Sequence, residues 1–150
     1  RYLIPFVVIA VLGDEAVTAI IKGIVDRARP TLNPIAAHLG PSFPSGHSST
    51  AAALYATLAL VLSRGRPPRV RALLAGGAVG IAVAVASSRV LLDVHWLSDV
   101  IAGLSLGWAW FAICAVAFGG RMLHFGASAE QLAVARPQAP RPGPRAAAPR

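Results

Sequence analysis

The chain has 150 residues, of which 55% are hydrophobic and only 13% are charged, and its mean hydropathy is +0.62. Soluble domains carry roughly 25% charged residues, so this composition excludes an ordinary soluble globule and a disordered protein. The net charge of +8 does not indicate nucleic-acid binding, because the cations are scattered between long apolar runs. The single cysteine, Cys114, excludes a disulfide framework and a cysteine-based metal site. The composition indicates an integral-membrane protein.

Four apolar segments approach the roughly 20 residues that span a bilayer as a helix. In chain order they are residues 2–21, 45–63, 70–87 and 96–118. The first segment is weakened by Pro5, Asp14 and Glu15, and none of the four shows the alternation of a β-strand. We predict an all-α, integral-membrane helical bundle with about four transmembrane helices, formed by residues 1–120.

Two glycine pairs, Gly76 with Gly80 and Gly103 with Gly107, are spaced four residues apart. Small residues at this spacing allow helices to approach closely, although the ordinary tolerance of membrane helices for glycine explains them equally well.

The loop at residues 64–71 carries four arginines and no acid. The excess of positive charge in cytoplasmic loops predicts that it faces the cytoplasm, which places residues 22–44 and 88–95 on the outer face. Lys22, Arg27, Arg29 and Arg89 also lie on that outer face. The assignment therefore depends on another role for these cations.

The two ends of the chain differ in character. The sequence begins at Arg1 without Met, enters an apolar run at once and lacks the pattern of a secretory signal, so we expect upstream sequence to be missing. Residues 127–150 contain many Pro, Arg and Ala residues, and we expect a disordered tail there because it cannot bury enough apolar surface to fold.

Polar residues cluster in three groups on one predicted face of the membrane. The first is Lys22, Arg29 and Pro30, where a spacing of seven residues predicts two cations on the same face of a helix end. Two such cations suit a phosphate, although snorkelling at a membrane boundary is the better explanation of this group alone. Asp26 lies between them and could pair with either cation.

The second group opens the second helix with the sequence Pro44-Ser45-Gly46-His47. Ser45 is expected to be the N-cap, and Gly46 lets a ligand approach the backbone. Free amides and the helix dipole make such an N-terminus an anion site, with His47 in its first turn. A simple capped helix with an interfacial histidine is an equally good reading of this group alone.

The third group contains Ser88, Arg89, His95 and Asp99. His95 and Asp99 are four residues apart on a helix, so the carboxylate can accept the Nδ1–H of the imidazole and leave Nε2 free as a nucleophile. A purely structural cap is the alternative, but an Asp and a His near a membrane favour function.

Together these groups resemble the three signature motifs of the type 2 phosphatidic acid phosphatase family, which also includes vanadium haloperoxidases. The resemblance covers residues 22–99 by motif and about 1–118 by helix layout. Members usually have six membrane helices and the first motif closes the third, so this chain resembles the last four helices of a bacterial member.

The resemblance implies a metal-independent phosphatase that hydrolyses a lipid phosphate or lipid pyrophosphate without a cofactor, at the outer face of the bacterial cytoplasmic membrane. Phosphatidate, phosphatidylglycerophosphate and undecaprenyl diphosphate are the substrate types it implies. The phosphate-binding residues would be Lys22, Arg29, Arg89, Ser45 and Gly46. His95 would form a phosphohistidine, Asp99 would stabilise its imidazolium, and His47 would act as the general acid and base.

Several alternatives are considered. Metal binding by His47, His95, Asp93 and Asp99 is disfavoured because three nearby cations would repel a divalent ion. A lipid phosphotransferase that uses the same histidine is the second enzymatic reading, and a non-catalytic lipid-binding membrane protein is the third. His38, His124 and Cys114 receive no role.

Overall fold

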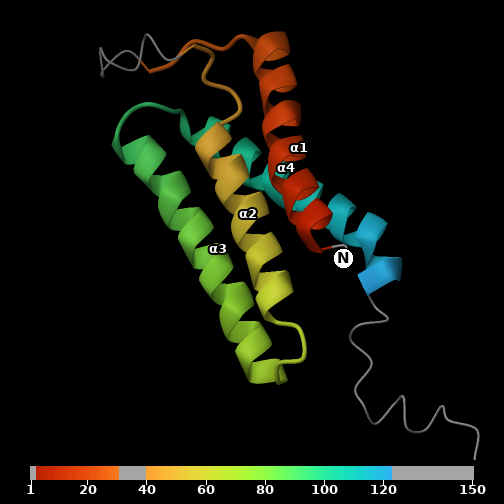
Figure 1. Ribbon diagram of the computed structural model, residues 1–150. Helices are drawn as coiled ribbons and strands as arrows, with labels where there is room; N and C mark the ends of the chain where they lie inside the picture. The colour runs from red at the N-terminus through yellow and green to blue at the C-terminus, as the bar shows by residue number, and fades with distance from the viewer. Residues whose placement is uncertain (1–2, 31–39, 123–150) are drawn as a thin grey trace, which may run out of the picture.

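The computed structural model describes residues 3–30 and 40–122. Within these ranges the chain forms four helices and no strand. The helices are α1 (Leu3–Val25), α2 (Gly46–Leu62), α3 (Pro68–Leu91) and α4 (Leu97–Met122). They run alternately in opposite directions, with α4 crossing the others obliquely (Figure 1). The predicted all-α bundle is confirmed. The proposed tail, His38 and His124 lie outside the described residues.

Helix α2 packs against all three other helices. Its buried side chains are small, including Ala51, Ala52 and Ala53, so neighbouring backbones can come close. A Cβ placed on Gly103 of α4 would lie 2.5 Å from the carbonyl oxygen of Ser45, and one on Gly107 would collide with the carbonyl oxygen of Ser49. This glycine pair therefore allows the close packing of α2 and α4.

The other glycine pair does not have this role. A Cβ on Gly76 or Gly80 of α3 would meet no atom within 4 Å in the described part of the chain. The same spacing of four residues therefore supports close helix packing at Gly103 and Gly107 only, because these two glycines face another helix and Gly76 and Gly80 do not.

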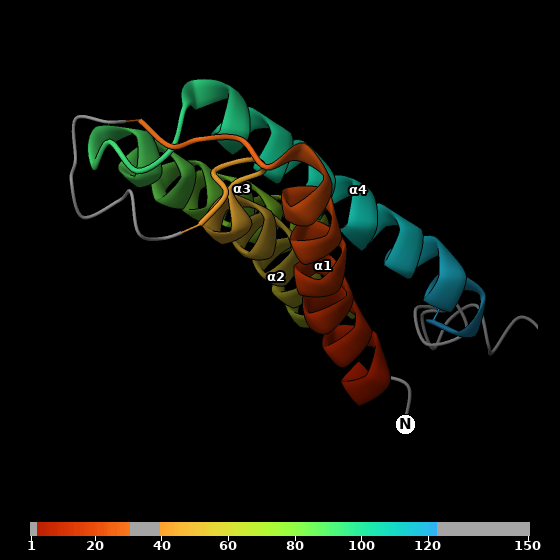
Figure 2. The ribbon, with the colours of Figure 1, turned by 90° about the horizontal axis from the view of Figure 1, so that it is seen from above.

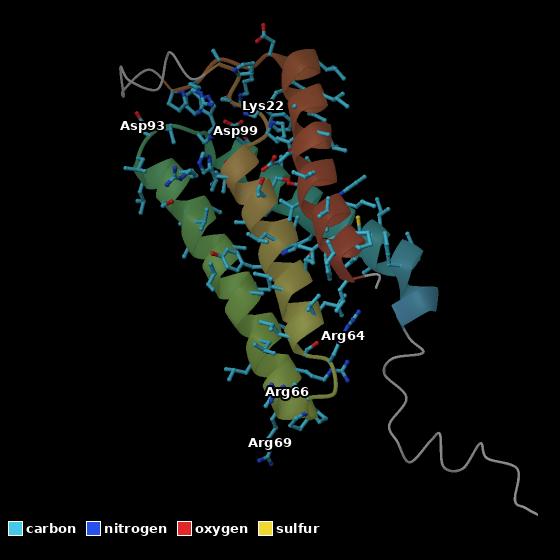
Figure 3. The ribbon with its side chains drawn as sticks, viewed as in Figure 1. Lys22, Arg64, Arg66, Arg69, Asp93 and Asp99 are labelled. Carbon is cyan, nitrogen blue, oxygen red and sulfur yellow. The ribbon has the colours of Figure 1, made fainter. Side chains whose placement is uncertain are left out.

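Three helical segments are long and apolar enough to cross a membrane, namely Leu3–Val25, Pro68–Leu91 and Leu97–Gly119. Helix α2 has 17 residues, about 26 Å at 1.5 Å per residue, which is shorter than a typical hydrocarbon core. Three of the four expected spans meet this length and composition, and α2 is a shorter apolar helix that runs between the same two ends of the bundle (Figure 3). Exposed apolar side chains such as Leu12 and Leu73 suit contact with lipid.

The polar groups of the bundle separate toward its two ends. Lys22 and Asp99 lie at the end where α1 finishes and α4 begins, whereas Arg64, Arg66 and Arg69 lie at the opposite end (Figure 3). The view from above shows the segment after α1 running across the end that holds Lys22 and Asp99, toward the α3–α4 connection (Figure 2). This end contains all three predicted polar groups.

Candidate active site

Hydrogen bonds to backbone carbonyls join the three predicted groups. The Lys22 ammonium donates to the Pro41 carbonyl at 2.9 Å, and the Arg29 guanidinium donates to Pro41 at 3.3 Å and to Val94 at 2.8 Å. The segment after α1, the approach to α2 and the approach to α4 are thereby held together. The structure thus brings the three groups to one place.

The route by which Lys22 and Arg29 meet differs from the prediction. Helix α1 ends at Val25, and Asp26 leaves the helical conformation with φ of 41°. Arg29 therefore lies in an extended segment, and the expected spacing along one helix is wrong. The two cations meet because that segment crosses the end of the bundle.

A pocket of about 720 Å³ opens among these side chains. Cations and histidines line its outer part: Lys22, Arg29, Arg89, His47 and His95, together with Gly46. Along the bundle, away from this end, the wall continues on α1, α2 and α3, with Glu15 and Ala19 exposed at its edge. Its other residues are Thr18, Thr50, Ala51, Leu54, Tyr55 and Val85. A pocket end lined by cations and histidines thus continues into a longer wall of mixed polarity.

Ser45 does not line this pocket. It occupies the predicted N-cap position of α2, but its side chain makes no capping hydrogen bond. The fully buried Ser45 hydroxyl accepts from the Ser48 hydroxyl at 3.0 Å, and the Ser45 amide donates to the Asp99 carbonyl at 2.9 Å. In this structure Ser45 joins the starts of α2 and α4, which differs from its expected place beside a phosphate.

His95 and Asp99 face each other at the start of α4, and both are buried. The distance from His95 Nδ1 to Asp99 Oδ2 is 3.6 Å, which is longer than a hydrogen bond. Asp99 instead accepts the Trp96 amide on Oδ2 at 3.0 Å and Arg27 on Oδ1 at 2.8 Å. The predicted pair is adjacent, but the expected hydrogen bond is not formed.

Arg29 faces the other side of the His95 ring. Its Nη1 lies 3.3 Å from His95 Nε2. A guanidinium can only donate, so this contact fits a ring with a lone pair on Nε2 and its proton on Nδ1, toward Asp99. Burial, followed by the charges of Arg29 and Lys22, lowers the pKa of His95 from 6.5 to about 4. His95 is therefore neutral at pH 7.

From its position in the sequence, Arg27 is expected only to be one of the outer-face cations. In the structure it also donates to the Ser98 hydroxyl at 2.7 Å, and its guanidinium lies over the Trp96 ring, 5.6 Å from the ring centroid. Arg27 is thus the ion-pair partner of Asp99. No sequence spacing indicates this contact, because the two residues are 72 positions apart.

Asp14, which the sequence analysis read as a weakness of the first span, is fully buried. Its carboxylate accepts the Ser49 hydroxyl at 2.6 Å and the Thr50 hydroxyl at 3.5 Å, which joins α1 to α2. The run of hydroxyl residues at the start of α2 was the available signal. Within residues 3–30 and 40–122, no group of three or more His, Cys, Asp or Glu side chains is placed to hold a metal ion.

Comparison with known proteins gives the chain its family. The model of the PAP2 superfamily matches residues 2–123. Phosphatidylglycerophosphatase B of Bacillus subtilis is 37% identical over 99 residues, which are 63% of this chain and 47% of that protein. Lipid A 1-phosphatase of Rhizobium johnstonii is 36% identical over 104 residues, which are 63% of this chain and 38% of that protein.

A solved structure also resembles the bundle. The transmembrane PAP2-type phosphatidylglycerolphosphate phosphatase from Bacillus subtilis matches with a TM-score of 0.69 and 32% identity, over 77% of this chain and 58% of its own. The chain thus spans between 38% and 58% of the length of these proteins. From its helices, its site and these likenesses, the chain is a multi-pass membrane protein that belongs to the PAP2 superfamily.

Proposed function

We propose that this chain carries the catalytic part of a metal-independent lipid phosphatase in which His95 is the nucleophile. The observation that carries the proposal is the placement of His95 Nε2 at the mouth of a pocket that also holds three cations and a second histidine. Attack on phosphorus requires a nucleophile with a lone pair and positive charges that stabilise the phosphoryl oxygens. The neutral imidazole and the neighbouring cations supply these two.

In the first step, Arg29 exchanges its contact with Nε2 for a phosphoryl oxygen. The lone pair of Nε2 then attacks phosphorus, and the bond to the leaving oxygen breaks. Lys22, Arg29 and Arg89 stabilise the negative charge on the phosphoryl oxygens, and the amide of Gly46 at the start of α2 adds a donor. Burial and then the charges of Arg89, Arg29 and Lys22 lower the pKa of His47. The negative charge of a bound phosphate offsets this effect, so His47 is protonated in the complex and donates its proton to the leaving alcohol. Asp99 compensates the positive charge that develops on His95, 3.6 Å away.

In the second step, His47 takes a proton from water, and the resulting hydroxide attacks the phosphohistidine. The P–N bond breaks, inorganic phosphate leaves and His95 returns to its neutral form. Ser45 contributes by holding the start of α2 against that of α4, so that His47 stays opposite His95.

The substrate is a lipid phosphate, by analogy with the relatives named for phosphatidylglycerophosphate and lipid A. The apolar wall residues Ala51, Leu54 and Val85 suit part of the lipid. We place the pocket at the outer face of the bacterial cytoplasmic membrane. This placement is supported by the arginine-rich turn at the opposite end of the bundle (Figure 3).

The test measures phosphate release and the phosphoenzyme together, using 4-nitrophenyl phosphate and phosphatidate in detergent with EDTA. Wild type is expected to release phosphate, to be inhibited by vanadate and to form an acid-labile phosphoenzyme. His95→Ala is expected to lose all three. His47→Asn is expected to keep a burst of nitrophenolate, since that leaving group needs no proton, while turnover of phosphatidate is lost.

Arg66→Gln, at the far end of the bundle, is the control and should behave as wild type. Undiminished activity in folded His95→Ala would contradict the nucleophile assignment. Activity lost in EDTA and restored by a metal would contradict the mechanism, and transfer of phosphate to an added alcohol in place of water would favour a phosphotransferase.

A further inference from the structure

The part of the pocket that extends along the helices, away from Lys22, carries more polar side chains than a hydrocarbon tail requires. On α1, Glu15, Thr18 and Lys22 share one face, and all three line the pocket. At 1.5 Å per residue, Glu15 lies about 10 Å from Lys22 along the helix. The half-buried Tyr55 of α2 lines the same wall. Polar groups are costly inside a membrane unless they serve a partner.

Thr18 is the sharpest indication of a missing partner. Its side chain is buried, with 4% of its surface exposed, and its hydroxyl has no hydrogen-bond partner among residues 3–30 and 40–122. Its methyl group packs toward Gly46, 3.7 Å from where a Cβ on that glycine would lie. A buried hydroxyl in a pocket wall costs free energy unless a ligand satisfies it.

The chemistry of Glu15 restricts what this ligand is. A carboxylate accepts hydrogen bonds and repels anions, so it disfavours a second phosphate. It also gains nothing from the ester carbonyls of a diacylglycerol, which only accept. A hydroxyl group donates to Glu15 and both donates to and accepts from Thr18. A phosphate-bearing group rich in hydroxyls therefore fits this wall.

We propose, resting on the phosphatase function above, that Glu15 and Thr18 bind the hydroxyl groups of a sugar or polyol that joins the phosphate to the lipid tail. The cations hold the phosphate, and the hydroxylated carrier lies along α1 within about 10 Å of it. The site thereby prefers hydroxyl-bearing lipid monophosphates to simple alkyl phosphates and to lipid diphosphates.

Two probes with the same tail test this preference: dodecyl phosphate, and dodecyl glucoside phosphorylated on its 6-hydroxyl. Wild type is expected to show a kcat/KM roughly tenfold or more in favour of the glucoside, as is typical for hydroxyls paired with a charged group. Glu15→Leu should bring this ratio close to one, because kcat/KM falls for the glucoside and not for dodecyl phosphate. Thr18→Val, which keeps the shape and loses the hydroxyl, should reduce the ratio severalfold.

Asp26→Asn is the matched control, because Asp26 is an exposed acid just after the same helix and does not line the pocket. Its ratio should equal that of wild type. The dissociation constants of both probes are also measured by calorimetry in His95→Ala, with and without Glu15→Leu. Failure of hydrolysis alone, with the ratio of dissociation constants intact, overturns the phosphatase function only. Equal binding of both probes, or a ratio that Glu15→Leu leaves unchanged, overturns the hydroxyl site.

Discussion

His95 combines burial with a surrounding of positive charge. Its side chain is 4% exposed, Arg29 contacts Nε2, and Lys22 adds a second charge. Both effects disfavour the imidazolium and hold the pKa of His95 at about 4 in the folded protein. In the unfolded chain the same side chain titrates near 6.5. The difference makes the stability of the protein depend on pH.

Wild-type protein is expected to lose stability as the pH falls from about 6.5 to about 4, the window set by the two pKa values of His95. In this window the unfolded state binds the proton and the folded state does not. The free energy of unfolding therefore decreases as the pH decreases. Thermal unfolding in detergent measures the effect. His95→Gln has no proton to bind at this position, so its melting temperature should fall less. Equal slopes for both proteins would contradict the assignment.

At the scale of single residues, the sequence predicted which side chains meet better than how they meet. Motif spacing identified Lys22, Arg29 and His95, and all three line one pocket. The ion pair between Arg27 and Asp99 was missed because it joins distant segments. The oxygen of Asp99 that lies nearest His95, Oδ2, accepts the backbone amide of Trp96, which the sequence also did not indicate.

At the scale of helices, the contact between α2 and α4 depends on two positions without side chains. Gly103 faces the carbonyl of Ser45, and Gly107 faces both the carbonyl of Ser49 and the Cβ of Ala52. Backbone oxygens cannot rotate away as a flexible side chain does. An added methyl group must therefore push the two helices apart.

Gly107→Ala is expected to destabilise the bundle by about 1–3 kcal/mol, the usual cost of overpacking. Gly80→Ala is the matched control, because its methyl group would meet open space and alanine favours a helix. Melting temperatures of the two variants in one detergent give the comparison. A Gly107→Ala protein as stable as wild type would show that the helices are less tightly packed.

Helix boundaries followed apolar composition closely, with one systematic difference. The second segment was expected at residues 45–63 and is Gly46–Leu62, whereas the first was expected to end at residue 21 and ends at Val25. A hydropathy pattern stops at the first charge. The helix continues past Lys22, and the Lys22 ammonium donates to the Pro41 carbonyl, which lies outside the helix.

At the scale of the whole molecule, positive charge marks both ends for different reasons. Arg64, Arg66 and Arg69 lie at one end of the bundle and Lys22 at the other (Figure 3). The proposed mechanism gives the cations beside the pocket a role in binding phosphate, so only the arginine-rich turn bears on orientation. This reasoning predicts a cytoplasmic turn and an outward pocket.

Cysteine labelling in intact cells tests this orientation in a Cys114→Ser background, where the only native thiol is removed. Asp26→Cys at the pocket end should react with a membrane-impermeant maleimide added outside. Arg66→Cys should react only after the cells are permeabilised. The reverse pattern would place the pocket in the cytoplasm.

The bond from the Ser45 amide to the Asp99 carbonyl has a consequence for how this scaffold diversifies. It joins the segment carrying His47 to the segment carrying His95, so the two histidines of the proposed mechanism are held in a fixed relative position. Glu15 and Thr18 belong to α1, outside these two segments. Under the two proposals, substitutions at Glu15 and Thr18 can therefore exchange one lipid for another, as long as Lys22 on the same face of α1 is retained.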